Sequence, residues 1–60
     1  MTKSELKEIK IIERYLAAGL VDTAARGASA LFRAASPRSA KAILEWAKAN
    51  GLATHPEFIA

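Results

Sequence analysis

The sequence predicts an all-α fold, a small three-helix bundle with a helix-turn-helix-like arrangement. Apolar residues recur at three- and four-residue steps through most of the 60-residue chain. Residues that start or stop helices divide the chain at three places, and no alternating strand pattern lies between them. We expect helices near residues 3–18, 23–35 and 37–50, in a single domain over residues 1–60, with residues 53–60 as a C-terminal tail.

The composition is that of a folded but weakly stabilised domain. Hydrophobic residues make up 52% of the chain and charged residues 25%, which is typical of globular proteins. A chain of this length buries only about 60% of the surface that its unfolded form exposes. Because there is no cysteine, neither a disulfide nor a thiolate metal site supplements the core. Stability must therefore come from helix packing or from self-association.

The first helix has clear signals at both ends. Thr2, followed three residues later by Glu5, predicts a capping box, in which each side chain accepts a hydrogen bond from the other residue's backbone. Gly19 predicts the left-handed residue that ends the helix, and Leu20 is expected to pack back on its last turn. Helical spacing gives one inward stripe of apolar residues, formed by Leu6, Ile9, Ile12 and Leu16.

The second helix is predicted to start at an Asp22 N-cap and to bury mostly small residues. Small side chains let helix axes approach closely, so Leu31 and Phe32 are expected to supply most of the bulk. Gly27 lies inside this helix and costs about 1 kcal/mol relative to alanine. The inward stripe consists of Ala24 or Ala25, Ala28, Leu31, Phe32 and Ala35.

The third helix is predicted to begin at Ser36, with Pro37 as its first helical residue. Gly51 is expected to end it, and Leu52 to fold back against it. Trp46 lies on the flank of its apolar face. The inward residues by helical spacing are Ala40, Ile43, Leu44 and Ala47.

Charge is the strongest functional signal. The net charge of +3 favours an anionic partner. Four cations of the first helix, spaced four, three and four residues apart, fall within about 60° of one another on its surface. Like charges at this spacing repel, so a face meant only for solubility would more often alternate signs. Two interpretations stay open, a solvated face and an anion-binding face. We name this set the basic row: Lys3, Lys7, Lys10 and Arg14.

A second group of cations lies between Asp22 and Glu45, where the sequence has no acid. Arg38 stands in the first turn of the third helix, where the macrodipole favours an acid and where free amides attract phosphate. In helix-turn-helix proteins the same part of a third helix enters the major groove. The alternative is that Arg38 is an ordinary surface residue. The unopposed cations are Arg26, Arg33, Arg38 and Lys41. The expected groove contacts are Ser36, Arg38, Ser39, Lys41 and Ala42.

Two family resemblances involve this third helix. The serine-rich start followed by "ILEWAKANGL", over residues 36–52, resembles the recognition helix of winged-helix regulators, which implies DNA binding. The residues that follow carry no pattern for the two strands of a wing, and the turn before the helix is shorter than that family uses. "AAGL" followed by "ILEWAKANG" is similar to a ubiquitin-associated domain, although the second helix here is about one turn longer.

No catalytic or metal-binding pattern appears. His55 is the only histidine and has no nucleophile partner nearby in sequence. The carboxylates are distributed as helix caps and solvated charges, and 60 residues do not enclose a deep pocket. We therefore expect a chain that is not an enzyme and that uses no cofactor and no metal.

Apolar residues outside the inward stripes allow two explanations. Either the tail folds across them, or they form a protein-binding patch or a homodimer seam, where aromatic residues are enriched. The residues concerned are Ile11, Tyr15, Trp46, Phe58 and Ile59.

The favoured functional hypothesis is a small basic, regulator-type protein that binds nucleic acid without catalysis. Its expected contacts are Lys3, Lys7, Lys10, Arg14, Arg26, Arg33, Arg38, Ser39 and Lys41. The alternative is a protein-interaction module, such as a small inhibitor or adaptor, which docks through an apolar helix face and can form a homodimer. A third interpretation places the first helix on a membrane surface. No apolar segment is long enough to cross a membrane, and a cytoplasmic location is the default expectation.

Overall fold

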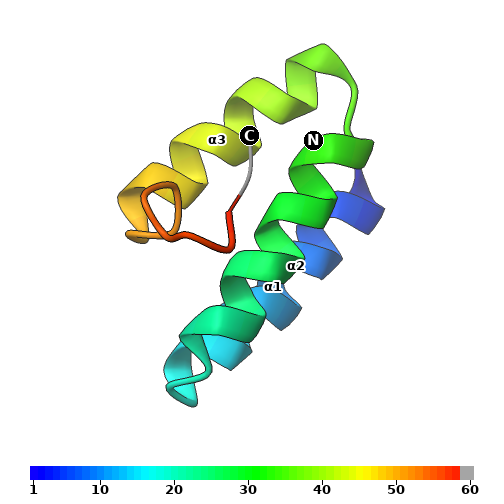
Figure 1. The fold of residues 1–60 in the computed structure, drawn as a ribbon. Coiled ribbons are helices and arrows are strands. Elements are labelled where there is room, and N and C mark those ends of the chain that lie inside the picture. The colour runs from blue at the N-terminus through cyan, green and yellow to red at the C-terminus, as the bar shows by residue number, and fades with distance from the viewer. Residues whose placement is uncertain (59–60) are drawn as a thin grey trace.

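The computed structural model describes residues 1–58 and contains three α-helices in that range, with no strand. They are α1 (Lys3–Ala17), α2 (Val21–Ala34) and α3 (Pro37–Ala49). α1 and α2 form an antiparallel hairpin, α3 crosses at its open end, and the tail returns over α2 (Figure 1). The predicted all-α three-helix fold is confirmed. Residues 1–58 contain no wing of the kind that the winged-helix resemblance implies.

The ends of α1 match their sequence signals. The Thr2 hydroxyl accepts a hydrogen bond from the Glu5 N–H at 3.1 Å, and the Glu5 carboxylate accepts one from the Thr2 N–H at 2.8 Å. Gly19 has a φ of +80°, and the Leu20 N–H donates to the Tyr15 carbonyl at 2.9 Å. This bond and the left-handed glycine form a Schellman ending. The Leu20 side chain after this ending is 50% exposed.

α2 starts two residues earlier than predicted. Its first residue is Val21, and Leu20 occupies the N-cap position without a side-chain hydrogen bond. The Schellman turn has already reversed the chain, so the Leu20 carbonyl accepts the first helical bond from the Ala24 N–H at 3.0 Å. The prediction of Asp22 as N-cap is therefore wrong. Its carboxylate instead lies 3.0 Å from Nε2 of His55, in the tail.

Both predicted ends of α3 are confirmed. The Ser36 hydroxyl accepts a hydrogen bond from the Ser39 N–H, and a proline opens the helix. Gly51 has a φ of +70°, and the Leu52 N–H donates to the Ala47 carbonyl at 2.8 Å. Leu52 is fully buried, so here the residue after the glycine does fold back.

The core is built where α2 meets α1 and α3. Gly27 marks the close approach of α1 and α2, because a Cβ atom placed there would lie 3.2 Å from Cγ1 of Ile12. Leu31 and Phe32 pack against this core but are only half-buried, and the largest fully buried side chains are Ile43 and Leu52 in place of the two that the sequence predicted. The buried hydrophobic residues are Ile9, Ile12, Ala24, Ala25, Ala28, Ile43, Ala47, Leu52 and Phe58.

One predicted inward position is exposed. Leu6 is 46% exposed, because Glu5, one turn before Ile9, occupies the core side of α1 and the next residue points about 100° away. On α3, Ser39 is buried although it lies outside the predicted stripe, and its hydroxyl contacts Glu5 of α1.

The tail packs on α2 through polar and aromatic contacts. The guanidinium of Arg26 lies 3.0 Å from the carboxylate of Glu57. The rings of Phe32 and Phe58 lie 5.7 Å apart, tilted by 49°, and Phe58 is buried. The tail therefore completes the core at α2, whereas Tyr15 on α1, which it was expected to help cover, stays 38% exposed.

Candidate nucleic-acid interface

The basic row lies on the face of α1 opposite its buried residues. All four side chains are exposed, and none has a carboxylate partner within residues 1–58. The helix alone positions them, since their spacing keeps them on one side through nearly three turns. From Lys3 to Arg14 the row runs for about 16 Å along the helix axis. The longest extent of the Cα trace is 28 Å, so the row covers more than half the length of the molecule.

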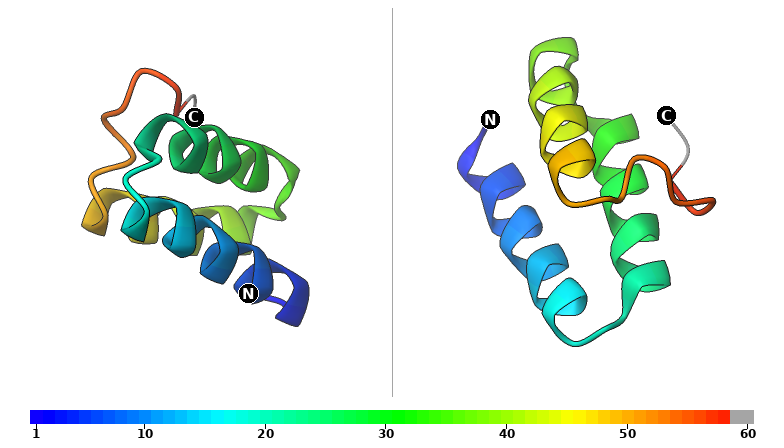
Figure 2. Two further views of the ribbon diagram at one scale, coloured as in Figure 1. Left: turned by 90° about the horizontal axis from the view of Figure 1, so that it is seen from below. Right: turned by 90° about the vertical axis from the view of Figure 1, so that its left-hand side faces the viewer.

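The cations of α2 face a different direction. Arg26 and Arg33 line a hollow of about 320 Å³ together with Ser29, Ala30 and Glu57. The tail, which contributes Glu57, lies on the side of α2 away from α1 (Figure 2, right). Arg26 is also paired with Glu57, which neutralises it locally. The structure thus keeps these two arginines apart from the basic row, and the cations of the chain do not form one continuous surface.

The first turn of α3 offers fewer polar side chains than predicted. Arg38 and Lys41 are exposed and have no carboxylate partner in the described part of the chain. Ser39, however, is only 6% exposed, and its hydroxyl donates to the Glu5 carboxylate at 2.9 Å. The expectation that Ser39 faces outward is therefore wrong. Ser36 is used as the helix cap.

The Glu5 carboxylate joins the N-terminal cap of α1 to the first turn of α3. Its carboxylate accepts hydrogen bonds from the Thr2 backbone N–H and from the Ser39 hydroxyl, and these bonds hold the pKa of Glu5 below its ordinary value of 4.5. The group is thus charged at neutral pH. The sequence predicted the bond to Thr2 but not the bond to Ser39, because a partner 34 residues away leaves no local signal.

A second polar contact joins α1 to α3 further along. The indole N–H of Trp46 donates to the Glu13 carboxylate at 3.1 Å. Together with the bond between Glu5 and Ser39, it fixes α3 alongside α1 at two points.

The residues predicted as a protein-binding patch differ in their exposure. Phe58 belongs to the core, and Ile11 and Trp46 are half-buried. Tyr15 is 38% exposed on α1. Ile59 lies outside the described residues. Burial of Phe58 against α2 removes the aromatic anchor that the tail was expected to contribute.

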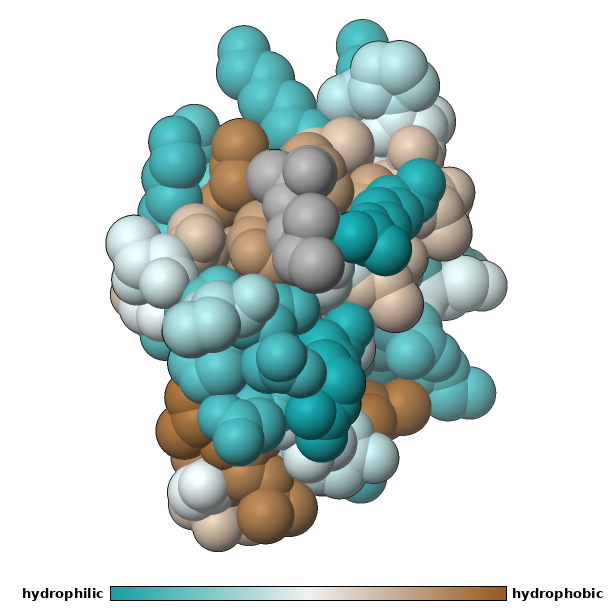
Figure 3. All heavy atoms as spheres, viewed as in Figure 1, coloured by the Kyte–Doolittle hydropathy of each residue, from teal (hydrophilic) through white to brown (hydrophobic). Residues whose placement is uncertain are grey.

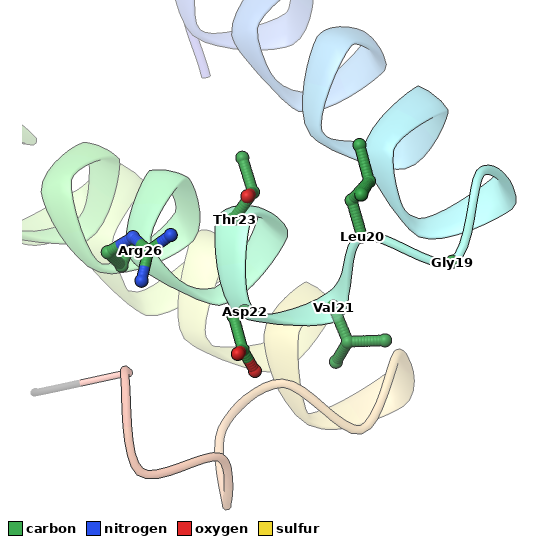
Figure 4. Close-up of a pocket in the computed structure, with 6 residues that line it drawn as sticks. All are labelled: Gly19, Leu20, Val21, Asp22, Thr23 and Arg26. Atoms are coloured by element: carbon green, nitrogen blue, oxygen red, sulfur yellow. The ribbon is translucent and has the colours of Figure 1, made fainter.

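Two of the large apolar side chains that are exposed in residues 1–58 are neighbours at the turn between α1 and α2. Leu20 and Val21 are 50% and 41% exposed. They line a hollow of about 320 Å³ together with Gly19, Asp22, Thr23 and Arg26. Figure 4 shows Leu20 and Thr23 on one side of the chain and Val21 and Asp22 on the other. Brown surface at the lower end of Figure 3 marks this part of the molecule. The sequence did not predict this exposed pair, because Leu20 was expected to pack back on the last turn of α1.

No match to the chain was found among protein-family models, curated proteins or solved structures. Within residues 1–58, no three histidine, aspartate or glutamate side chains come together as metal ligands would. No helix in that range combines the length and the apolar character needed to cross a bilayer. The exposed charges described above are therefore the features of the molecule that indicate a function.

Proposed function

We propose that this chain is a small non-enzymatic protein that binds nucleic acid, with the basic row as its main contact surface. The observation that carries the proposal is a line of four exposed cations without carboxylate partners in the described residues. Neighbouring like charges on a helix each cost a few tenths of a kcal/mol, roughly 0.2 to 0.5. An anion with regularly spaced charges relieves that repulsion along the whole row.

The phosphodiester backbone is such an anion. Each lysine or arginine that neutralises a phosphate releases condensed counterions, which provides most of the affinity of non-specific complexes. Arg38 and Lys41 on α3 add two exposed cations to the proposed interface. Arg26 and Arg33 are left out of the proposed interface, because they lie beside Glu57 on another side of α2 and Glu57 already pairs with Arg26.

The test is retention of the protein on immobilised duplex and single-stranded DNA at two ionic strengths. We expect retention near 50 mM salt and release near 200 mM, since binding through phosphates weakens steeply with salt. The double variant Arg38→Ala and Lys41→Ala is expected to keep its helices and to bind more weakly. Absence of retention at the lower salt would remove the proposal. An unchanged affinity in the double variant would confine the site to α1.

Protein docking remains the second candidate, favoured by the exposed pair Leu20 and Val21 beside a hollow. Its simplest form is a homodimer through this turn. Sedimentation of the wild type at high micromolar concentration tests it, with Leu20→Ser as the matched variant. A dimer that Leu20→Ser converts to a monomer would support docking at this turn. A wild-type monomer would rule out this form of it.

A further inference from the structure

We infer that the protein holds the phosphodiester backbone without reading base sequence, so that α3 is not a recognition helix. This inference rests on the proposed function and specifies its ligand. Two observations support it. The exposed surface of α3 has few neutral polar groups, and the Glu5 carboxylate lies beside the first turn of α3.

Base edges are read by side chains that offer donors and acceptors in fixed positions. In the first turns of α3, the two hydroxyl side chains are committed within the protein. Ser36 caps the helix, and Ser39 is buried against Glu5. The neighbouring Ala40 and Ala42 carry no polar side-chain atom. The neutral hydrogen-bonding groups that a recognition helix presents are thus missing from this surface.

The bond between Ser39 and Glu5 also connects the N-terminal turn of α1 to the first turn of α3 through their side chains. It brings a carboxylate whose pKa lies below its ordinary value to the part of α3 that would enter a groove. A fixed negative charge there opposes close approach to DNA. The remaining polar side chains of these turns, Arg38 and Lys41, are exposed cations, which can contact phosphates or guanine. Without neutral donors and acceptors beside them, they do not specify a base sequence.

The basic row has the chemistry of a backbone contact. Three of its four members are lysines, which act as flexible point charges and do not fix the orientation of a base. Its length of about 16 Å corresponds to about five phosphates of one strand, at roughly 3.4 Å of axial rise each. DNA and RNA present the same phosphodiester groups. The row offers no neutral donor or acceptor for the 2′-hydroxyl that distinguishes them.

Selection from a library of randomised duplex DNA tests the inference with the whole chain. We expect no enriched base motif after several rounds. We also expect affinities within about threefold for an unselected DNA duplex and its RNA counterpart, from two to four phosphate contacts in each. An enriched motif would overturn the inference. Arg38→Lys keeps the charge but loses the planar guanidinium group. If this variant no longer enriched the motif, α3 would be a recognition helix.

Two further outcomes concern the proposed function itself. Failure to bind any nucleic acid at low salt would overturn both the proposed function and the inference. So would binding to vesicles of anionic lipid in the absence of nucleic-acid binding. Binding with a strong base preference would overturn the inference alone, so the two failures are distinguishable.

Discussion

At the scale of single residues, Glu5 joins three parts of the chain. Its carboxylate accepts hydrogen bonds from the Thr2 N–H at 2.8 Å and from the Ser39 hydroxyl at 2.9 Å. The first bond caps α1, and the second connects that cap to the first turn of α3. A charged acceptor strengthens both bonds relative to a neutral one. The junction therefore depends on Glu5 being ionised.

Replacing Ser39 by alanine should raise the pKa of Glu5 towards its ordinary value of 4.5, because one of the two donors is lost. Carbon-13 NMR of the Glu5 carboxyl group, followed through a pH titration, measures this. Ser4→Ala is the matched control, since Ser4 is exposed on the same turn. An unchanged pKa in Ser39→Ala would contradict the contact.

The same residue predicts a pH dependence of folding. Since the pKa of Glu5 is lower in the folded chain, its stabilising contribution is fully present above the unfolded value near 4.5. The contribution disappears as the pH falls through the folded pKa. Urea unfolding of wild type and Glu5→Gln should therefore differ at pH 6 and converge at strongly acid pH. A difference that stays constant across this range would show that the ionised carboxylate is not responsible.

At the scale of elements, the helix ends divide into those that the sequence predicted and one that it did not. The capping box at Thr2 and the glycine endings at Gly19 and Gly51 were predictable, because each signal lies within a few adjacent residues. The start of α2 was not, because the chain enters this helix directly after the Schellman turn and Leu20 takes the N-cap position in place of Asp22. The contact of Asp22 with His55 was not predictable either, since its partner lies far away in the sequence.

Gly51→Ala should destabilise the protein by about 1 to 2 kcal/mol, because a residue with a Cβ is strained in the left-handed region. Gly51→Asn should cost less, since asparagine enters that region more readily. Urea denaturation of the two variants measures the difference. If both variants lost the same free energy of unfolding, glycine would not be needed here for its φ of +70°.

Removal of the tail's aromatic anchor should be more damaging. Phe58→Ala is expected to cost about 3 kcal/mol, because the ring is buried against Phe32. Glu57→Gln, one residue away, should cost no more than about 1 kcal/mol, since its ion pair with Arg26 is exposed. Urea unfolding tests both variants, and Phe58→Leu provides a milder change if alanine prevents folding. If Phe58→Ala lost little free energy of unfolding and Glu57→Gln lost much, the ion pair and not the buried ring would hold the tail.

At the scale of the whole molecule, the cations are spread over more than one surface. The basic row was predictable, because one helix fixes the relative positions of its own residues. Whether Arg26 and Arg33 would join it was not, since that depends on how the tail packs. The tail contributes Glu57 beside both arginines, on the side of α2 away from α1. The proposed interface is therefore narrower than the charge of the chain suggests.

The most direct test of the proposed interface is the salt dependence of duplex binding, measured by fluorescence anisotropy. With four phosphates neutralised, the slope of log K against log salt should be about −3.6, at about 0.9 per contact. Lys7→Gln with Lys10→Gln should make it shallower by about 2. Arg33→Gln with Lys48→Gln removes the same charge elsewhere and should change the slope little. Equal slopes in the two double variants would contradict a binding surface on the basic row.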